Sequence, residues 1–386
     1  MARLSVPVRP RHRSRTFAVF KWWSVGCCWW ATNARAFRLS RVICTPSRSR
    51  FQHIRLHSRA TNTLVEQKVE LSTGVSMQVL SMVPSRKTDK PMLLFLHGSF
   101  HGAWCWSERY FEYFTQRGYP VVAPSWRGTG GTYAGDGVQK VQIGQHVEDL
   151  RALLTDPQRH LSRMVDSSSS AVQLRPVVVS HSFGGLAVMK MLEEDIQTAT
   201  WLRGIVNMCV VPPSGNGKMT LRYLQRSLSD SWKITAGFAM KRCLTDTKLC
   251  RELFFGGDKI TLPNGTIEDY GVSDADILRY QSYFARDSQA TIDLLNLGKQ
   301  LPSSSTDRNG MAFFVPHLPP RVVMGATDDF IVDRVGLEET AVYYDAGAPI
   351  LIDSPHDIML GAKWENGALA VEDWLSSNIV PGPDSS

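Results

Sequence analysis

The first 65 residues of this 386-residue chain contain neither aspartate nor glutamate. They hold 12 arginines and one lysine, and the first acidic residue is Glu66. The rest of the chain therefore has 30 basic and 36 acidic residues, so the net charge of +7 belongs to the leader and the body carries −6. A mildly acidic body lacks the basic surface typical of nucleic-acid-binding proteins. We therefore expect no nucleic-acid partner.

A long, uninterrupted apolar run is also missing. Residues 17–31 are largely apolar, but Lys21 interrupts them and the run is short for a membrane span. The body offers no second candidate, so we expect no transmembrane segment in the mature protein.

The composition of the leader is instead typical of an organelle transit peptide, because it is rich in arginine and serine and lacks acids. Residues 34–36 form an A-x-A cleavage pattern, and Phe37 opens a second Arg/Ser-rich run. This order resembles the bipartite plastid presequence of algae with secondary plastids. We expect residues 1–62 to be a largely disordered leader addressed to a plastid or, alternatively, a mitochondrion. A disordered tail or a wrongly assigned start codon is the other interpretation.

Cysteine pairs with metal-binding or redox spacing are absent. The body has four cysteines, Cys105, Cys209, Cys243 and Cys250. None belongs to a C-x-x-C pair, and none has histidines at zinc spacing. We expect buried free thiols, no metal and no cofactor.

The body alternates short apolar runs with helix-like segments. Residues 65–71 and 77–83 predict an antiparallel hairpin. Buried parallel strands are predicted at residues 91–96, 119–123, 177–179, 202–211, 321–324 and 349–353. Helices are predicted between them, which indicates an α/β fold with a mostly parallel sheet flanked by helices.

The alternation stops between residues 214 and 302, where helical patterns predominate. We expect a core of residues 63–213 and 303–386 with a helical cap inserted between them, and Ser273 as the N-cap of one cap helix. Several aromatic residues are expected inside this cap: Trp232, Phe238, Phe254, Phe255, Tyr280, Tyr283 and Phe284. Core packing explains most of them, although one or two could roof an apolar acyl or alkyl pocket.

Reactive side chains follow several of the predicted strands. Ser182, Asp328 and His356 each lie at such a strand end, where functional groups gather in open parallel sheets. Serine, acid and histidine in that chain order are typical of the α/β-hydrolase fold. A serine hydroxyl is a weak nucleophile and needs an imidazole to take its proton and a carboxylate to orient that imidazole.

The tetrahedral intermediate of acyl transfer also needs hydrogen-bond donors at its oxyanion. We expect these to be the backbone N–H groups of Phe183, after the nucleophile, and Ser99, after the first parallel strand. The usual elbow pattern G-x-S-x-G lacks its first glycine here, because Ser180 stands in that place. Ser180 is small enough to fit and should point away, so Ser182 is the expected nucleophile and Ser180 the alternative.

The neighbouring acids and histidines have plainer expected roles. Asp329 is the alternative acid but should point elsewhere, and three further acids, Asp333, Asp353 and Asp357, should lie on the surface or cap helices. His97 should bond within its own loop and His181 should pack. His101 and Trp126 are expected either to line a substrate pocket or to pack, and His146 and His317 to be surface or core residues.

Residues 63–380 resemble the α/β-hydrolase superfamily. The run L-H-G-S-F-H-G-A-W-C-W at residues 96–106 is similar to a signature of the plant methyl esterase and hydroxynitrile lyase group, whose oxyanion positions fall on Ser99 and Phe183. Residues 325–332 and 355–360 look more like uncharacterised plant and bacterial hydrolases with a helical cap. The resemblance implies Ser182, Asp328 and His356 as the catalytic triad. The long cap and the leader depart from the small methyl esterases.

The expected function is therefore that of a serine hydrolase. It would cleave a carboxylic ester, or thioester, of a small or acyl-chain substrate through an acyl-enzyme. Epoxide hydrolases and haloalkane dehalogenases with this fold need an aspartate where Ser182 stands, which argues against both. A hydroxynitrile-lyase-type or other non-hydrolytic triad enzyme, and a ligand-binding receptor on the same scaffold, stay open. So do the substrate and the oligomeric state.

Overall fold

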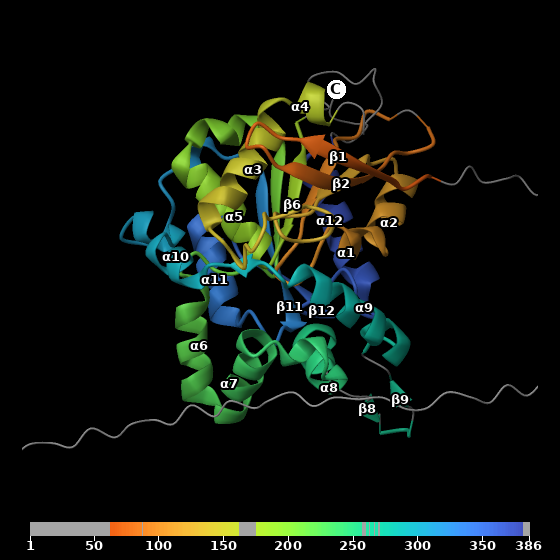
Figure 1. Ribbon diagram of the computed structural model, residues 1–386, viewed down its shortest axis with the longest axis vertical. Helices are drawn as coiled ribbons and strands as arrows, with labels where there is room; N and C mark the ends of the chain where they lie inside the picture. Colours follow the sequence, from red (N-terminus) through yellow and green to blue (C-terminus); the bar gives the residue numbers. More distant parts are fainter. Residues whose placement is uncertain are drawn as a thin grey trace, which may run out of the picture. The chain divides into compact units, whose positions relative to one another are not determined.

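The computed structural model describes residues 62–380, apart from residues 87, 162–174, 257–259, 262, 266 and 269–270 (Figure 1). Almost the whole predicted leader lies outside these residues, so its cleavage and its organelle address stay predictions. In the part of the chain that the structure describes, no helix has both the length and the apolar character to cross a membrane.

Eight strands form one sheet in the order β1-β2-β4-β3-β6-β7-β11-β12. They are β1 (Val65–Glu70), β2 (Ser76–Met82), β3 (Leu93–Leu96), β4 (Val121–Pro124), β6 (Val177–His181), β7 (Gly204–Met208), β11 (Arg321–Asp328) and β12 (Ile350–Pro355). The β1–β2 and β2–β4 pairs are antiparallel and the other five are parallel. The predicted N-terminal hairpin and mostly parallel sheet are thus confirmed.

Helices cover both faces of this sheet, which explains why β3, β4, β6 and β7 are buried along their whole length. Leu94 and Leu96 of β3 pack in one cluster, whereas Leu93 and Phe95 pack in another on the opposite face. The first face is covered by α3 (Ile143–Thr155) and α5 (Phe183–Glu194). The second is covered by α1 (Trp104–Ser107), α2 (Tyr110–Gln116) and α12 (Trp364–Asn378).

The segment between β7 and β11 is mainly helical. Its longer helices are α6 (Gly215–Arg226), α7 (Leu228–Ile234), α9 (Asp274–Asp287) and α10 (Leu294–Lys299), and shorter turns include α8 (Thr247–Cys250). Ser273 caps α9 as predicted, because its hydroxyl accepts the backbone N–H of Asp276 at 3.1 Å. Figure 1 shows α6, α7, α8 and α9 together at one end of the sheet.

Two strand pairings and one burial state in this segment differ from the prediction. The short β8 (Ile260–Thr261) and β9 (Ile267–Glu268) form an antiparallel pair. The short β10 (Thr291–Ile292) pairs in parallel with β5 (Lys140–Val141), where only a helix was expected. Trp232 does not join the aromatic interior but is 57% exposed, because it lies on the outward face of the short α7. Phe254, Phe255 and Phe284, in contrast, are buried.

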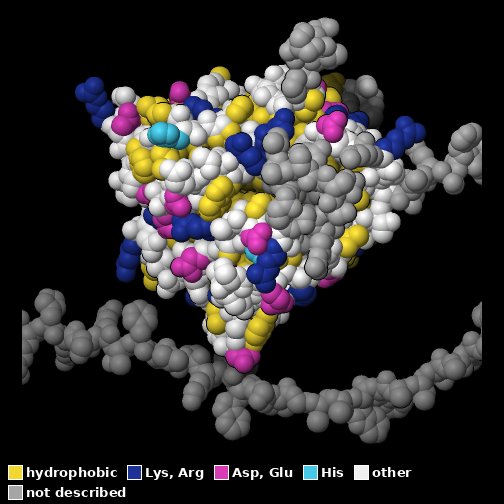
Figure 2. All heavy atoms as spheres, turned by 90° about the horizontal axis from the view of Figure 1, so that it is seen from above, with side chains coloured by type: hydrophobic (Ala, Val, Ile, Leu, Met, Phe, Trp, Pro, Cys, Tyr) yellow, Lys and Arg dark blue, Asp and Glu magenta, His cyan; other side chains and the backbone are white. Residues whose placement is uncertain are grey.

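The surface does not gather charge of one sign on the face drawn in Figure 2. Basic and acidic side chains are interspersed over the described part of that face. Pairs such as Arg334 with Glu338, at 2.7 Å, illustrate this mixing on α11 (Arg334–Tyr344).

Candidate active site

Ser182 occupies a strained turn between β6 and α5. Its φ of 51° and ψ of −122° lie in a region that residues with a side chain rarely adopt, and such strain is typical of functional sites. Gly184 makes the turn possible, because a Cβ there would lie 2.8 Å from the carbonyl oxygens of Leu96 and His97. The strand-to-helix turn thus has the geometry of a nucleophile elbow at Ser182.

Ser180 lies one step back in the strand and points elsewhere. It is fully buried, and its hydroxyl donates to the side-chain Oδ1 of Asn207 in β7 at 3.1 Å. The structure therefore gives Ser180 a packing position inside the sheet and leaves Ser182 at the apex of the turn.

The loop after β3 lies directly against the elbow. A Cβ on Gly98 would be 2.7 Å from Ser182 Cβ and 3.3 Å from Ser182 Oγ, so only glycine fits here. Ser99 follows in this loop, and Phe183 is the first residue of α5, whose N–H has no acceptor within its own helix. Within the described part of the chain neither amide has a hydrogen-bond acceptor. Both predicted oxyanion donors are therefore uncommitted.

His97 holds this loop in place, as expected for a structural residue. Its Nε2 accepts the backbone N–H of Trp126 at 3.0 Å, and the Trp126 indole N–H donates back to the His97 carbonyl at 2.8 Å. Burial lowers the pKa of His97 to about 3, which keeps the ring neutral and able to accept. Trp126 is only 2% exposed and serves this contact, so the structure does not support a pocket-lining role for it.

His356 follows β12 and pairs with an acid that was not the preferred one. Its Nδ1 lies 2.9 Å from both carboxylate oxygens of Asp329. The predicted partner, Asp328, is exposed and makes no hydrogen bond or ion pair with His356 among the described residues. A register shift between Ala326 and Asp328 in the β11–β12 ladder displaces the strand end, and Asp328 is still part of β11. The first residue beyond the strand, Asp329, therefore turns toward the histidine.

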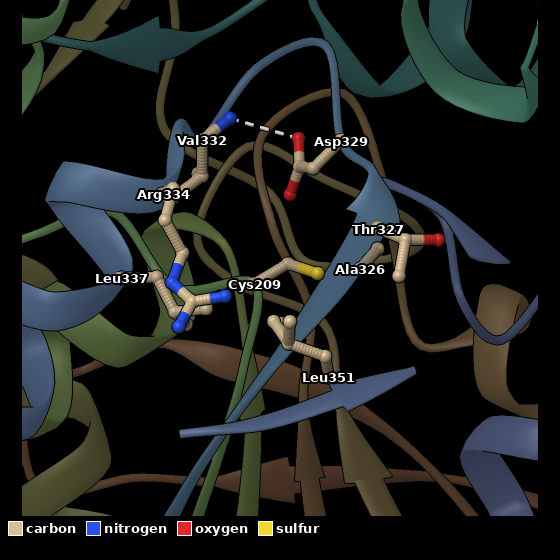
Figure 3. Close-up of a pocket in the computed structure, with 9 residues that line it drawn as sticks. Cys209, Ala326, Thr327, Asp329, Val332, Arg334, Leu337 and Leu351 are labelled. Atoms are coloured by element: carbon tan, nitrogen blue, oxygen red, sulfur yellow. Dashed lines mark hydrogen bonds between the residues drawn. The ribbon is translucent and has the colours of Figure 1, made fainter. Parts of the chain in front are cut away.

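The Asp329 carboxylate is fixed from two sides. Its Oδ1 accepts the backbone N–H groups of Ile331 and Val332, both at 2.8 Å, the second drawn as a dashed line in Figure 3. Burial alone would lower the pKa of His356, but the Asp329 carboxylate, and to a smaller degree Asp357, raise it above its usual value. The pair thus favours the imidazolium form of His356.

Contacts through His181 place the His356 loop beside the elbow. His181 immediately precedes Ser182, and its Nε2–H donates to the His356 carbonyl at 3.0 Å. The two imidazole rings are 4.7 Å apart. No hydrogen bond joins Ser182 Oγ to His356 Nε2 between these described residues, and catalytic hydrogen bonds are often long in the absence of substrate.

Sequence analysis missed a second carboxylate–imidazole pair in this cluster. Asp357 was expected to lie on the surface or to cap a helix, but it is fully buried and its Oδ2 lies 2.9 Å from Nε2 of His101. His101 is 1% exposed and packs edge-on against Phe284 of α9, so it does not line an open pocket either. Burial of Asp357 depends on a residue 256 positions away, for which the sequence holds no local signal.

A small pocket of about 210 Å³ adjoins Asp329, as Figure 3 shows. It lies between the end of β11 and the start of α11, with Cys209, Arg334 and Leu337 among its lining residues. Cys209 was expected only as a buried thiol. It follows β7 with a left-handed φ of 47°, and burial followed by the Asp329 charge holds its thiol pKa well above the usual range. All four body cysteines are free and buried, as predicted.

Two groups in this cluster have the ligand types of a metal site. The ligand atoms of Cys209, Asp329 and His356 lie within 4.8 Å of one another, and so do those of His181, His356 and Asp357. Asp329 and His356 already bond to each other, so a metal would have to displace that hydrogen bond.

The comparisons with known proteins agree with this architecture. The sequence matches the model of the alpha/beta hydrolase family over residues 93–364, and the chain therefore belongs to that family. No curated protein matches the chain.

Among solved structures, epoxide hydrolase A from Mycobacterium thermoresistibile is 16% identical, with a TM-score of 0.55, over 81% of this chain and 98% of that one. The enol-lactonase from Burkholderia xenovorans is 13% identical, with a TM-score of 0.52, over 80% and 99%. The epoxide hydrolase VrEH1 from Vigna radiata is 18% identical, with a TM-score of 0.50, over 81% and 97%. At such identities the likeness establishes the fold, and the predicted α/β-hydrolase fold is confirmed.

Proposed function

We propose that this hydrolase cleaves a carboxylic ester, or a thioester, through an acyl-enzyme formed on Ser182. The observation that carries the proposal is a serine at the strained elbow, with the His356–Asp329 pair on the adjoining loops. Two of the three similar structures named above are epoxide hydrolases, but that chemistry needs an aspartate at the elbow. Function follows the site and not the fold. A lactone is a cyclic ester, so the fold likeness to an enol-lactonase is compatible with ester cleavage.

Each residue then has a defined part in the reaction. His356 takes the proton of the Ser182 hydroxyl as Oγ attacks the acyl carbon, and later gives it to the leaving alcohol or thiol. Asp329 keeps the Nδ1 proton in place and stabilises the imidazolium. The N–H groups of Ser99 and Phe183 would bind the oxyanion, since neither has another acceptor in the described chain. Water, activated by His356, releases the acid.

A fluorophosphonate probe tests the nucleophile. We expect the wild-type protein to be labelled at a pH where His356 is neutral, and Ser182→Ala to lose the label. Ser180→Ala is the matched control and should be labelled at the wild-type rate. An unlabelled wild-type protein would sink the proposal.

Turnover of p-nitrophenyl esters of graded acyl length then separates the alternatives. Hydrolysis that is lost in Ser182→Ala supports the esterase and sizes the acyl pocket. Labelling without hydrolysis would favour a lyase of the hydroxynitrile type, and ligand binding without either would favour a receptor.

We also propose that the leader directs the protein to a plastid, with a mitochondrion as the alternative. Its composition supports an organelle address. Residues 1–62 fused to a fluorescent protein should carry it into one of these organelles, and a diffuse signal would contradict the proposal.

A further inference from the structure

The buried pair of Asp357 and His101 connects two loops of the proposed catalytic site. Asp357 follows His356 directly in the chain, and its Oδ2 is 2.9 Å from His101 Nε2. On the other side of the ring, His101 Nδ1 is 2.8 Å from the carbonyl oxygen of Ser99. His101 thus lies between the turn that carries the base and the loop that carries an oxyanion donor.

The hydrogen-bond partners of His101 determine its charge. A backbone carbonyl can only accept, and an ionised carboxylate can only accept, so each ring nitrogen must carry a proton. Burial would raise the pKa of Asp357, but His101, followed by smaller contributions from His181 and His356, lowers it below its usual value, which keeps the carboxylate ionised. His101 and Asp357 therefore form a buried imidazolium–carboxylate pair.

The loop that His101 holds contains a residue with a strained backbone conformation. Phe100, between Ser99 and His101, has a φ of 67°, which is costly for a residue with a side chain. The hydrogen bond from His101 closes this turn and fixes the Ser99 carbonyl. On the opposite side, the Asp357 backbone N–H donates to the carbonyl of Phe254 at 2.9 Å, so the pair is also fixed to the segment between β7 and β11.

We propose that Asp357 and His101 are positioning residues, whose ion pair clamps the oxyanion loop to the turn that carries His356. The inference rests on the proposed function. Acyl transfer needs the base and the oxyanion donors at fixed places around one carbon atom, and a misplacement of about 1 Å can cost roughly a hundredfold in rate. Buried ion pairs contribute little net stability, so a positional role is a physical reason to keep one here.

Asp357→Asn and His101→Gln test the clamp. Each single change leaves one partner without its counter-charge, and we expect kcat for a p-nitrophenyl ester to fall by about ten- to a hundredfold, with KM within about twofold. The rate of fluorophosphonate labelling should fall in parallel. The double variant Asp357→Asn/His101→Gln replaces the ion pair by two amides that can still bond, so it should recover more kcat than either single variant.

A matched control is the buried carboxylate of Asp149, which binds the Arg127 guanidinium at 2.8 and 2.9 Å and is likewise fully buried. Asp149→Asn also unpairs a buried charge, but on α3, and Asp149 has no hydrogen bond to either loop among the described residues. It should lower the melting temperature and leave kcat unchanged. An equal fall of kcat in Asp149→Asn and Asp357→Asn would mean that general destabilisation explains both and would overturn the clamp.

The pH profile gives a readout that a purely structural role would not move. The groups that face His356 are Asp329, Cys209, His181 and Asp357. Asp357 raises the pKa of His356, and in Asp357→Asn the acidic limb of kcat/KM should move to lower pH. An acidic limb of kcat/KM that does not move in Asp357→Asn would contradict the inference.

The charge state of His101 can be measured without turnover. Two-dimensional ¹H–¹⁵N spectra of the ring nitrogens should show that both nitrogens of His101 carry hydrogen-bonded protons in the wild-type protein, and that only one does in Asp357→Asn. A His101 ring with only one protonated nitrogen in the wild-type protein overturns the clamp even if Ser182 is labelled. An unlabelled wild-type protein removes the proposed function, and with it the catalytic meaning of the clamp, whatever the spectra show.

Discussion

Two carboxylate–imidazole pairs of the same length lie side by side in this hydrolase and differ in one respect. Asp329 holds Nδ1 of His356 at 2.9 Å, and Asp357 holds Nε2 of His101 at 2.9 Å. Both ring nitrogens of His101 face acceptors, whereas Nε2 of His356 has no partner among the described residues. A histidine can transfer a proton only through a nitrogen that the fold leaves open, so the first pair is suited to catalysis and the second to positioning.

The two pairs also differ in the group whose protonation they shift. The first pair raises the pKa of its histidine, and the second lowers the pKa of its aspartate. In both cases the neighbouring opposite charges together outweigh the burial of the group that they face. We expect the first pair to control the pH dependence of the reaction, and we expect the Asp357 carboxylate of the second pair to stay ionised.

The largest expected effect separates Asp329 from its neighbour. Asp329→Asn should lower kcat about 10³- to 10⁴-fold, because an amide cannot hold the Nδ1 proton of His356 and favours the wrong tautomer. Asp328→Asn, one residue earlier and exposed, should change kcat by less than about threefold. Ester hydrolysis by the two variants measures this. If Asp328→Asn were the more damaging change, the assignment of the acid in the structure would be wrong.

A smaller effect concerns the pH dependence of the wild-type enzyme. Because His356 must be neutral to accept a proton and its pKa is raised, kcat/KM should rise with pH through a midpoint above 6.5. His181, beside it, has its pKa lowered to about 3, chiefly by burial and then by the His356 charge, and stays neutral in this range. The profile should therefore show one titration on its acidic side. A midpoint below 6.5 would mean that the Asp329 charge does not outweigh burial.

Much of the site could be predicted from the sequence, because its residues follow strands that are recognisable one at a time. Ser182 and His356 come directly after apolar runs, and a strand end is a local property of the chain. The choice between Asp328 and Asp329 is different. It depends on a register shift between β11 and β12, which arises from the pairing of two strands and leaves no trace in the G-x-x-D spacing.

Burial of Asp357 and exposure of Trp232 could not be predicted for a related reason. A carboxylate is expected at the surface unless a partner compensates its charge, and the partner of Asp357 is 256 residues away. Trp232 lies on a helix whose outward face no other described element covers, which an aromatic residue in a sequence does not reveal. The fold class depends on local patterns, whereas these two positions depend on tertiary contacts.

A third kind of buried histidine, with no hydrogen bond to a carboxylate among the described residues, differs from both pairs. The pKa values of His97, His146 and His181 are each lowered to about 3, first of all by burial. These rings are neutral in the folded state but become charged below about pH 6.5 in the unfolded state. Below pH 6.5 the unfolded state therefore binds protons that the folded state does not. The free energy of unfolding is unaffected by these histidines above pH 6.5 and decreases as the pH falls from there toward 3.

Urea unfolding between pH 4.5 and pH 7.5 measures this loss. Each such histidine adds up to about 1.4 kcal/mol per pH unit to the slope of the free energy of unfolding against pH. His146, which packs against Trp126 and Phe183, is the most accessible to substitution, because its ring is only in van der Waals contact with them. His146→Gln should reduce the slope of the free energy of unfolding against pH by the contribution of one histidine. A free energy of unfolding that did not change with pH would show that these rings are not held neutral.

The smallest expected effect concerns Ser180, which stands where the elbow pattern has glycine. Ser180→Ala removes one buried hydrogen bond to Asn207 and should cost about 1 kcal/mol of stability, with ester hydrolysis unchanged. Ser180→Gly should cost somewhat more, because glycine also loses conformational freedom within β6. Thermal unfolding and hydrolysis of the same preparations measure both quantities.

The contrast with Ser182 makes this small effect informative. Both serines are buried and lie two residues apart, but the hydroxyl of Ser180 is bonded within the sheet and that of Ser182 lies at a strained turn facing the Gly98 loop. If the first glycine of the pattern were needed for the reaction itself, Ser180→Gly would raise kcat. We expect no increase, because the position requires only a side chain small enough to fit between β6 and β7. A gain in kcat would show that the hydroxyl of Ser180 limits the elbow.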